Sequence, residues 1–199
     1  MSLRERKKEQ TREALSWAAL HLAVERGIEN VRVEDIAAAA GVSARTFNNY
    51  FTSKFEAIYW RALARSEAAA VAVRERPAGE PLWDAVIAAV VEQYTAEGES
   101  RAPEGWQAGV RAMMQAPEMT GEYLKLSRRT EREMAVAVAD RTGTDLDKDL
   151  YPHLVAAAVA AAVYVATDRW MQSEPPVPPM ASLIEDGLRQ IAAGLPAPR

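Results

Sequence analysis

The chain has 199 residues, a net charge of −4 and no cysteine. This length accommodates one large domain or two small ones, and the lack of cysteine excludes disulfides, thiolate zinc sites and cysteine nucleophiles. Two histidines, His21 and His153, are too few for a multi-histidine metal site in one chain, so neither a metal nor a cofactor is predicted.

The first predicted helix ends at Gly27, after an inner face formed by Leu15, Ala18, Ala19, Leu22 and Ala23. A basic segment precedes this face, with cations at Arg4, Arg6, Lys7, Lys8 and Arg12. Glutamates at positions 5, 9 and 13 lie among these cations. The segment is therefore either a mixed, solvated helix face or a surface on which Arg4 and Lys8, four residues apart, meet a phosphate.

Three further helices are predicted before residue 75. The second is short and stops at Gly41; its apolar positions are Val33, Ile36, Ala37 and Ala40. Ser43 is a good N-cap for the third helix, which is expected to run to about Phe51. Ser53 can cap the fourth helix, which is expected to run to about Arg74.

Residues 33–51 predict a helix-turn-helix, because Gly41 can take the positive φ of a tight turn between two short amphipathic helices. Phe47 and Phe51 are expected to anchor the third helix, whose opposite face presents Ala44, Arg45, Asn48 and Asn49. In a major groove, arginine can read guanine and asparagine can read adenine, each through two hydrogen bonds. A small three-helix domain with a polar surface would show the same pattern, so the motif alone leaves both interpretations open.

Beyond a break at Pro77, Gly79 and Pro81, helices are predicted at about 82–97, 104–115, 117–141, 147–172 and 180–194. No strand alternation is found, so the fold is predicted to be all-α with about nine helices. We place a helix-turn-helix domain at residues 1–65, with the motif at about 32–51, and a larger helical body at residues 66–199.

The body has no catalytic constellation: its sequence lacks a Gly-rich phosphate loop, a G-x-S-x-G elbow and a paired acid and base. Its large apolar side chains either line a pocket for a small apolar or amphipathic effector or form plain core. The candidates are Trp83, Trp106, Met113, Met114, Tyr123, Leu126, Tyr164 and Trp170.

No export or membrane-spanning segment is expected. The N-terminus lacks an apolar h-region. The longest apolar run, Leu154 to Ala166, has thirteen residues, whereas ~20 are needed to cross a bilayer. The run fits a buried helix, and a cytoplasmic location is predicted.

Residues 10–63 resemble the DNA-binding domain of the tetracycline-repressor (TetR) family of bacterial transcriptional regulators. The resemblance rests on the Gly27 stop, the VEDIA helix, the AGVS turn, the TF and YF pairs of the third helix and the SK that follows. It implies an all-helical homodimer that binds a palindromic operator on double-stranded DNA. It also implies that a small-molecule effector binds residues 66–199, the ligand-binding and dimerisation domain, and releases the operator.

The resemblance further implies roles for individual residues. The positions that match the family's base contacts are Ala44, Arg45, Thr46 and Asn48. Those that match its usual phosphate contacts are Ser43, Tyr50 and Lys54. The family often has threonine where this chain has Arg32, so a hydroxyl cap is lost there and a cation beside phosphate is gained.

In this family the last two helices normally pair with their copies in a four-helix dimer interface, although a protein core would use the same residues. The C-terminal pattern is also similar to an actinobacterial branch with an acyl-coenzyme-A-like ligand domain. In that case Arg128, Arg129 and Arg132 meet an anionic group; otherwise they form a solvated face.

The leading interpretation is a ligand-responsive repressor without enzymatic activity, and an activator of the same fold is not separable from it by sequence. The alternative from another class is a small all-helical enzyme or metabolite-binding protein whose N-terminal domain is only structural. Salt-sensitive binding to a specific duplex favours the regulator. Turnover of a metabolite without DNA affinity favours the alternative.

Overall fold

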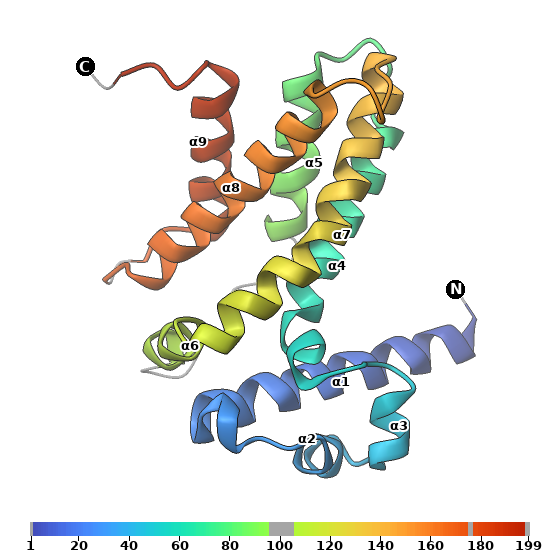
Figure 1. Ribbon diagram of the computed structural model, residues 1–199, viewed down its shortest axis with the longest axis vertical. Helices are drawn as coiled ribbons and strands as arrows, with labels where there is room; N and C mark the ends of the chain where they lie inside the picture. The colour runs from blue at the N-terminus through green and yellow to red at the C-terminus, as the bar shows by residue number, and fades with distance from the viewer. Residues whose placement is uncertain (1, 96–105, 175–176, 198–199) are drawn as a thin grey trace. The chain divides into compact units, whose positions relative to one another are not determined.

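The computed structural model describes residues 2–95, 106–174 and 177–197, and within these ranges the chain forms helices and no strand. The all-α fold is therefore confirmed (Figure 1). The elements are α1 Leu3–Arg26, the 3-10 helix η1 Ile28–Asn30, α2 Val33–Ala39, α3 Ala44–Asn48, α4 Lys54–Glu75, α5 Leu82–Thr95, α6 Trp106–Met114, α7 Pro117–Thr142, α8 Tyr151–Met171 and α9 Met180–Ala192.

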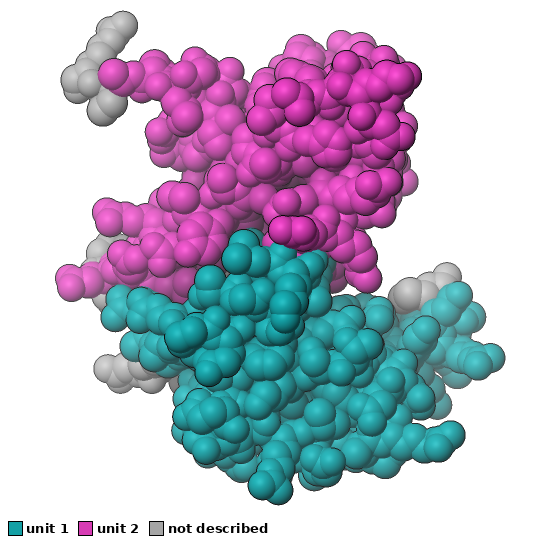
Figure 2. Space-filling model, in the orientation of Figure 1, with its two compact units in different colours: residues 1–63, 103–126 teal, residues 64–102, 127–199 magenta. Residues whose placement is uncertain are grey.

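The chain packs as two compact units, which Figure 2 shows in different colours. Unit 1 contains residues 1–63 and 103–126, and unit 2 contains residues 64–102 and 127–199. The break after Leu63 lies close to the boundary predicted after residue 65. Helix α6 and the first part of α7, however, pack with the N-terminal helices, although the sequence analysis assigned them to the body.

A close approach between α1 and α6 explains why α6 belongs to unit 1. A β-carbon on Gly109 of α6 would lie 2.6 Å from Cγ1 of Val24 on α1, so glycine is required for this packing. Met113 and Met119 are buried in the same cluster as Leu15 and Ile36. The apolar face of α1 therefore supports both the helix-turn-helix and the α6–α7 segment.

The core of unit 2 is built from α4, α5, α7, α8 and α9. Fully buried side chains of this core are Val73, Val86, Val138, Ile184 and Leu188. Helix α9 packs on α8 at Gly187, where a β-carbon would meet that of Ala162 at an ordinary contact distance of 3.7 Å, so this packing does not require glycine. Alanine-rich faces pack closely in this unit because their side chains are small.

Two predicted helix bounds were wrong. The third helix ends at Asn48 and not at about Phe51, since Asn49 and Tyr50 turn the chain toward α4. Helix α8 begins at Tyr151 and not at 147, because aspartates hold the preceding residues in a turn. Asp149 Oδ2 accepts from the Asp145 N–H at 2.7 Å, and Asp145 Oδ1 accepts from the Asp147 N–H at 2.9 Å.

Among the described helices, α8 alone has a length and composition that would also allow it to cross a membrane. No such segment was expected, because the uninterrupted apolar run has only thirteen residues. Core helices of soluble proteins meet the same criterion. One side of α8 does serve the core, through Pro152, Val155, Ala156, Val159, Ala162 and Ala166.

Arg141 binds backbone carbonyls at the end of α4 and in the segment that follows it, within unit 2. Its Nη1 donates to the carbonyls of Val73 and Arg76 at 3.2 and 2.9 Å, and its Nη2 donates to those of Pro77 and Glu80 at 2.8 and 3.0 Å. The carbonyls of Val73 and Arg76 lie at the end of α4, where no further helical turn supplies an N–H. The Glu80 carboxylate itself binds Arg76, whose guanidinium lowers the pKa of Glu80.

Replacing Arg141 by methionine is expected to destabilise the protein by about 2 kcal/mol, because several carbonyls lose a charged donor and regain only water. Urea unfolding measures this change through the transition midpoint. Arg132→Met, at an exposed position of the same helix, is the matched control and should leave the midpoint unchanged. Equal midpoints for the two variants would contradict the capping role.

Candidate nucleic-acid interface

The third helix, α3, has only five residues and is held from its inner side and its N-terminus. Phe47 is fully buried and Phe51 is 2 % exposed, with their ring centroids 5.7 Å apart. Ser43 Oγ accepts from the Thr46 N–H at 3.1 Å, so the predicted N-cap is confirmed. A helix this short is unstable alone, so the cap and the two phenylalanines position it.

The turn before α3 has the geometry that the sequence required. Gly41 has φ +70°, and the Val42 N–H donates to the Ala37 carbonyl at 2.9 Å. A side chain at Gly41 would meet nothing, so only the backbone conformation selects glycine here. Val42 packs against the unit 1 core.

The outer face of α3 gathers the predicted base contacts. Arg45, Asn48 and Asn49 are exposed, and Ala44 and Thr46 are partly exposed beside them. The Thr46 hydroxyl lies 2.9 Å from that of Ser43, so these two predicted contacts share one hydrogen bond. The face offers one arginine and two amides over short side chains, which suits a major groove.

Arg32 and Tyr50 lie just before α2 and just after α3 in the chain. Arg32 is exposed at the N-cap of α2, where Asp35 Oδ2 accepts from its backbone N–H at 3.2 Å. An arginine side chain has no acceptor for the first N–H groups of α2, so Asp35 supplies only the reciprocal half of a capping box. Tyr50 packs partly against the unit 1 core.

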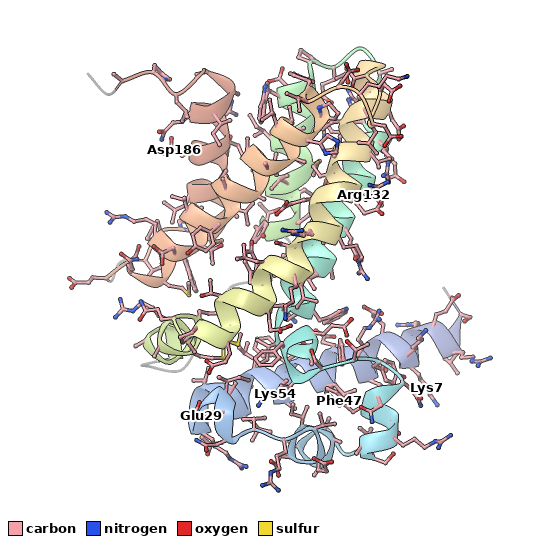
Figure 3. All side chains as sticks on the ribbon, viewed as in Figure 1. Lys7, Glu29, Phe47, Lys54, Arg132 and Asp186 are labelled. Carbon is pink, nitrogen blue, oxygen red and sulfur yellow. The ribbon has the colours of Figure 1, made fainter. Side chains whose placement is uncertain are left out.

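Lys54 has a structural partner that sequence analysis missed. Its Nζ donates to the carbonyls of Ile28 and Val31 at 2.6 and 2.9 Å, which ties the start of α4 to η1 and to the residue before Arg32 (Figure 3). The partners lie 26 and 23 residues away, so no local pattern could indicate them. An ammonium group has three donors, and one remains for a phosphate. The phosphate contact stays a prediction.

The predicted ligand-binding residues divide between the units. Met113, Met114, Tyr123 and Leu126 pack in or against the unit 1 core, whereas Trp83 packs against the unit 2 core. Tyr164 is 58 % exposed on α8 and Trp170 is partly buried near its end. The side chain of Trp106 lies outside the described residues. A role for these residues in ligand binding stays a prediction.

A pocket of about 320 Å³ lies between α5 and α9 in unit 2. Its lining combines apolar side chains with two carboxylates and a guanidinium. The lining residues are Asp84, Ile87, Ala88, Val91, Glu185 and Arg189. Arg189 is already paired with Glu185 at 2.7 Å. None of the predicted ligand residues lines this pocket. The described part of the chain contains no group of three or more His, Asp or Glu residues that could hold a metal ion.

An anchored short helix with an exposed polar face, set after a glycine turn, is the arrangement of a helix-turn-helix, which many DNA-binding proteins share. Residues 17–56 match the bacterial regulatory proteins of the tetR family, and residues 80–196 match the MftR C-terminal domain. The chain therefore belongs to the tetR family of bacterial regulatory proteins, and it is a DNA-binding transcriptional regulator.

Its relatives agree with this assignment. The chain is similar to the HTH-type transcriptional regulator TcmR of Streptomyces glaucescens, with 36 % identity over 172 residues that cover 84 % of this chain and 76 % of TcmR. Its fold is similar to that of a putative TetR-family transcriptional regulator from Syntrophomonas wolfei, with a TM-score of 0.60, 15 % identity and coverage of 96 % and 100 %. It is also similar to that of the fatty acid degradation regulator FadR from Bacillus halodurans, with a TM-score of 0.56, 14 % identity and coverage of 94 % and 97 %.

We expect Lys54→Met to destabilise the free protein by about 1–2 kcal/mol, because two backbone carbonyls lose a charged donor. Urea unfolding without DNA measures this loss. Arg45→Met is the control: it removes a cation from the exposed face of α3, where the described structure gives it no partner, and should not shift the midpoint. If both variants unfold like the parent protein, Lys54 does not hold the turn after α1.

Proposed function

We propose that this regulator is a repressor that binds a palindromic operator as a homodimer and is released by a small apolar or amphipathic effector. The observation that carries the proposal is the outer face of α3, where Arg45, Asn48 and Asn49 are exposed on a helix fixed by its inner face. A fixed helix presents side chains to base edges in one register, which sequence-specific reading requires.

Each cation of the interface has a separate role in this proposal. Arg45 projects from the middle of α3 and reads a guanine, while Arg32 and the third donor of Lys54 contact phosphates. The hydroxyls of Ser43 and Tyr50 contribute further phosphate contacts. Phosphate contacts set the position of α3, whereas the base contacts carry the specificity.

A second copy of the chain is the proposed partner of the outer face of α8. This face exposes large apolar side chains on a helix whose other face is core: Leu154 is 62 % exposed, Tyr164 58 % and Val165 63 %. These residues follow helical spacing along one side. Contiguous apolar surface of this kind marks an interaction site, and the resemblance places the dimer interface on the last two helices.

The effector is proposed to bind residues 66–199 and to act through α4, which carries Lys54 at its first residue and Val73 near its last turn. A shift of α4 would move η1 and the helix-turn-helix, because Lys54 ties them to its start. Exposed Arg128 and Arg132 are available to an anionic effector of the acyl-coenzyme-A type, whereas Arg129 pairs with Glu67.

The protein is proposed to act in the cytoplasm, where its DNA is found, and to have no catalytic role. An activator would use the same DNA surface, so a reporter gene placed behind the operator decides between repression and activation. The match of residues 17–56 to the tetR family supports a regulator over a metabolite-binding protein or enzyme with a merely structural N-terminal domain.

Arg45→Ala is expected to weaken binding to the operator more than to random duplex. A lost bidentate contact to guanine costs ~1–3 kcal/mol at one base pair. Fluorescence anisotropy with operator and scrambled duplexes measures both affinities, and Arg132→Ala serves as a control for the loss of one positive charge. Equal losses on the two duplexes would make Arg45 a phosphate contact only.

Leu154→Glu is expected to dissociate the homodimer, because it would bury an unpaired carboxylate in an apolar interface. Sedimentation equilibrium measures the association. Leu124→Glu changes a leucine of similar exposure, 60 %, on α7 and should leave the dimer intact. A Leu154→Glu protein that still associates like the parent would remove α8 from the interface.

Induction requires that an effector and the operator weaken each other's binding by the same factor, since coupling between two sites is reciprocal. Calorimetric titration of an inducing ligand, with and without saturating operator, measures that factor. Identical ligand affinities in the two titrations would rule out release by this route.

A further inference from the structure

The first turns of α1 extend beyond the packed part of unit 1. Residues 2–10 are all exposed, yet they are helical and well capped: Ser2 Oγ accepts from the Glu5 N–H at 3.2 Å, and Glu5 Oε2 accepts from the Ser2 N–H at 2.6 Å. The hydrogen bonds from Ser2 lower the pKa of Glu5. The N-terminal segment is thus a projecting helix, and its side chains occupy defined faces (Figure 1).

The contacts of Arg12 show which face of α1 lies beside the end of α3. Its guanidinium lies 5.8 Å from the ring centroid of Phe51 and 5.9 Å from that of Trp60. Phe51 comes three residues after the end of α3, and its ring is packed against that of Phe47. The face of α1 that bears Arg12 therefore meets unit 1 at the C-terminal end of α3. Arg12 Nε is buried without a partner among the described residues, so the aromatic rings hold this group in place.

Two more cations continue the line of Arg12 away from the core. Arg4, Lys8 and Arg12 are spaced four residues apart, so they share one side of α1 over about 12 Å of helix axis. Both Arg4 and Lys8 are exposed and have no ion pair within the described part of the chain. We call these three residues the α1 cation row. Figure 3 labels Lys7, which lies between two members of the row in sequence.

The acidic residues of the segment lie on a different side. Glu5, Glu9 and Glu13 are also four residues apart, and each is one position after a member of the row, about a quarter turn around the helix. Glu13 is bound to Arg61 of α4 at 3.3 Å, and Glu5 is bound to Ser2. Glu13 is therefore paired with a cation outside the row, whereas Glu5 stays charged but lies on another side of the helix.

We propose that Arg4 and Lys8, the exposed members of the α1 cation row, bind backbone phosphates of the operator outside the base pairs that α3 reads. This inference rests on the proposed function. The row begins beside the C-terminal end of α3, and the duplex that α3 is proposed to bind is the polyanion that the row would contact. Free exposed cations supply the salt-dependent part of such binding. Of the two interpretations of this segment, the proposal takes the phosphate-facing side.

Lys8→Gln tests the row, with Arg6→Gln as its matched control. Both variants remove one positive charge from exposed positions two residues apart on one helix, but Arg6 lies on the opposite side from the row. Affinity for operator duplex is measured at several salt concentrations. For Lys8→Gln the slope of log K against log salt should shrink by about 0.9, the value for one phosphate contact, and for Arg6→Gln it should not change.

Duplex length supplies a second readout. The parent protein should bind a duplex trimmed to the α3 base pairs more weakly than one with flanking pairs, and Lys8→Gln should bind the two with more similar affinity. Equal slopes of log K against log salt for Lys8→Gln and Arg6→Gln would contradict the proposal that the row binds phosphate. If the parent protein shows no operator preference, the proposed function fails, while the slopes on random duplex still decide whether the row binds phosphate.

Discussion

Phe47 and Phe51 hold in place a helix of five residues that has too few hydrogen bonds to persist alone. Neighbouring features of unit 1 depend on this anchoring. The glycine turn at Gly41 brings α3 to the core, Ser43 caps it, and the ring of Phe51 also receives the guanidinium of Arg12. The inner side of α3 is therefore constrained at each end, and its outer side is free to be polar.

The cations of the chain fall into two groups with different physical roles. Lys54 and Arg141 turn inward and donate to backbone carbonyls, where they replace hydrogen bonds that a helix or turn cannot make for itself. Arg4, Lys8 and Arg45 are exposed and have no such partner in the described structure. Net charge does not distinguish these groups, but hydrogen-bond partners do. The exposed group is the one suited to a polyanion.

Local sequence patterns predicted most of the fold, because helical spacing, glycine stops and serine caps are local causes. The end of α1 and the bounds of α2, α4 and α7 agree with prediction to within about two residues. The features that were not predicted are non-local packing and two local turns. The packing of Gly109 on Val24, which draws α6 into unit 1, depends on residues far apart in the chain. The early stop of α3 and the late start of α8 depend on turns that the apolar spacing does not record.

The same distinction applies to the candidate site: its local features could be predicted, and its long-range contacts could not. The exposed face of α3 follows from a four-residue spacing of two phenylalanines, so Arg45, Asn48 and Asn49 could be placed in advance. The carbonyl partners of Lys54 and the aromatic partners of Arg12 could not, since they join α1, η1 and α4. Large apolar residues were the poorest predictors of a ligand-binding site, because a core and a pocket use the same side chains.

Hydroxyl-radical and methylation footprinting of the protein on an operator selected from random duplexes tests the central claim most directly. Two dimer-related copies of α3 should protect two major-groove patches with two-fold symmetry, one helical turn or a multiple of it apart, where one turn is about 34–36 Å. Guanine methylation within each patch should block binding. A single unpaired patch, or protection that does not depend on sequence, would contradict the account.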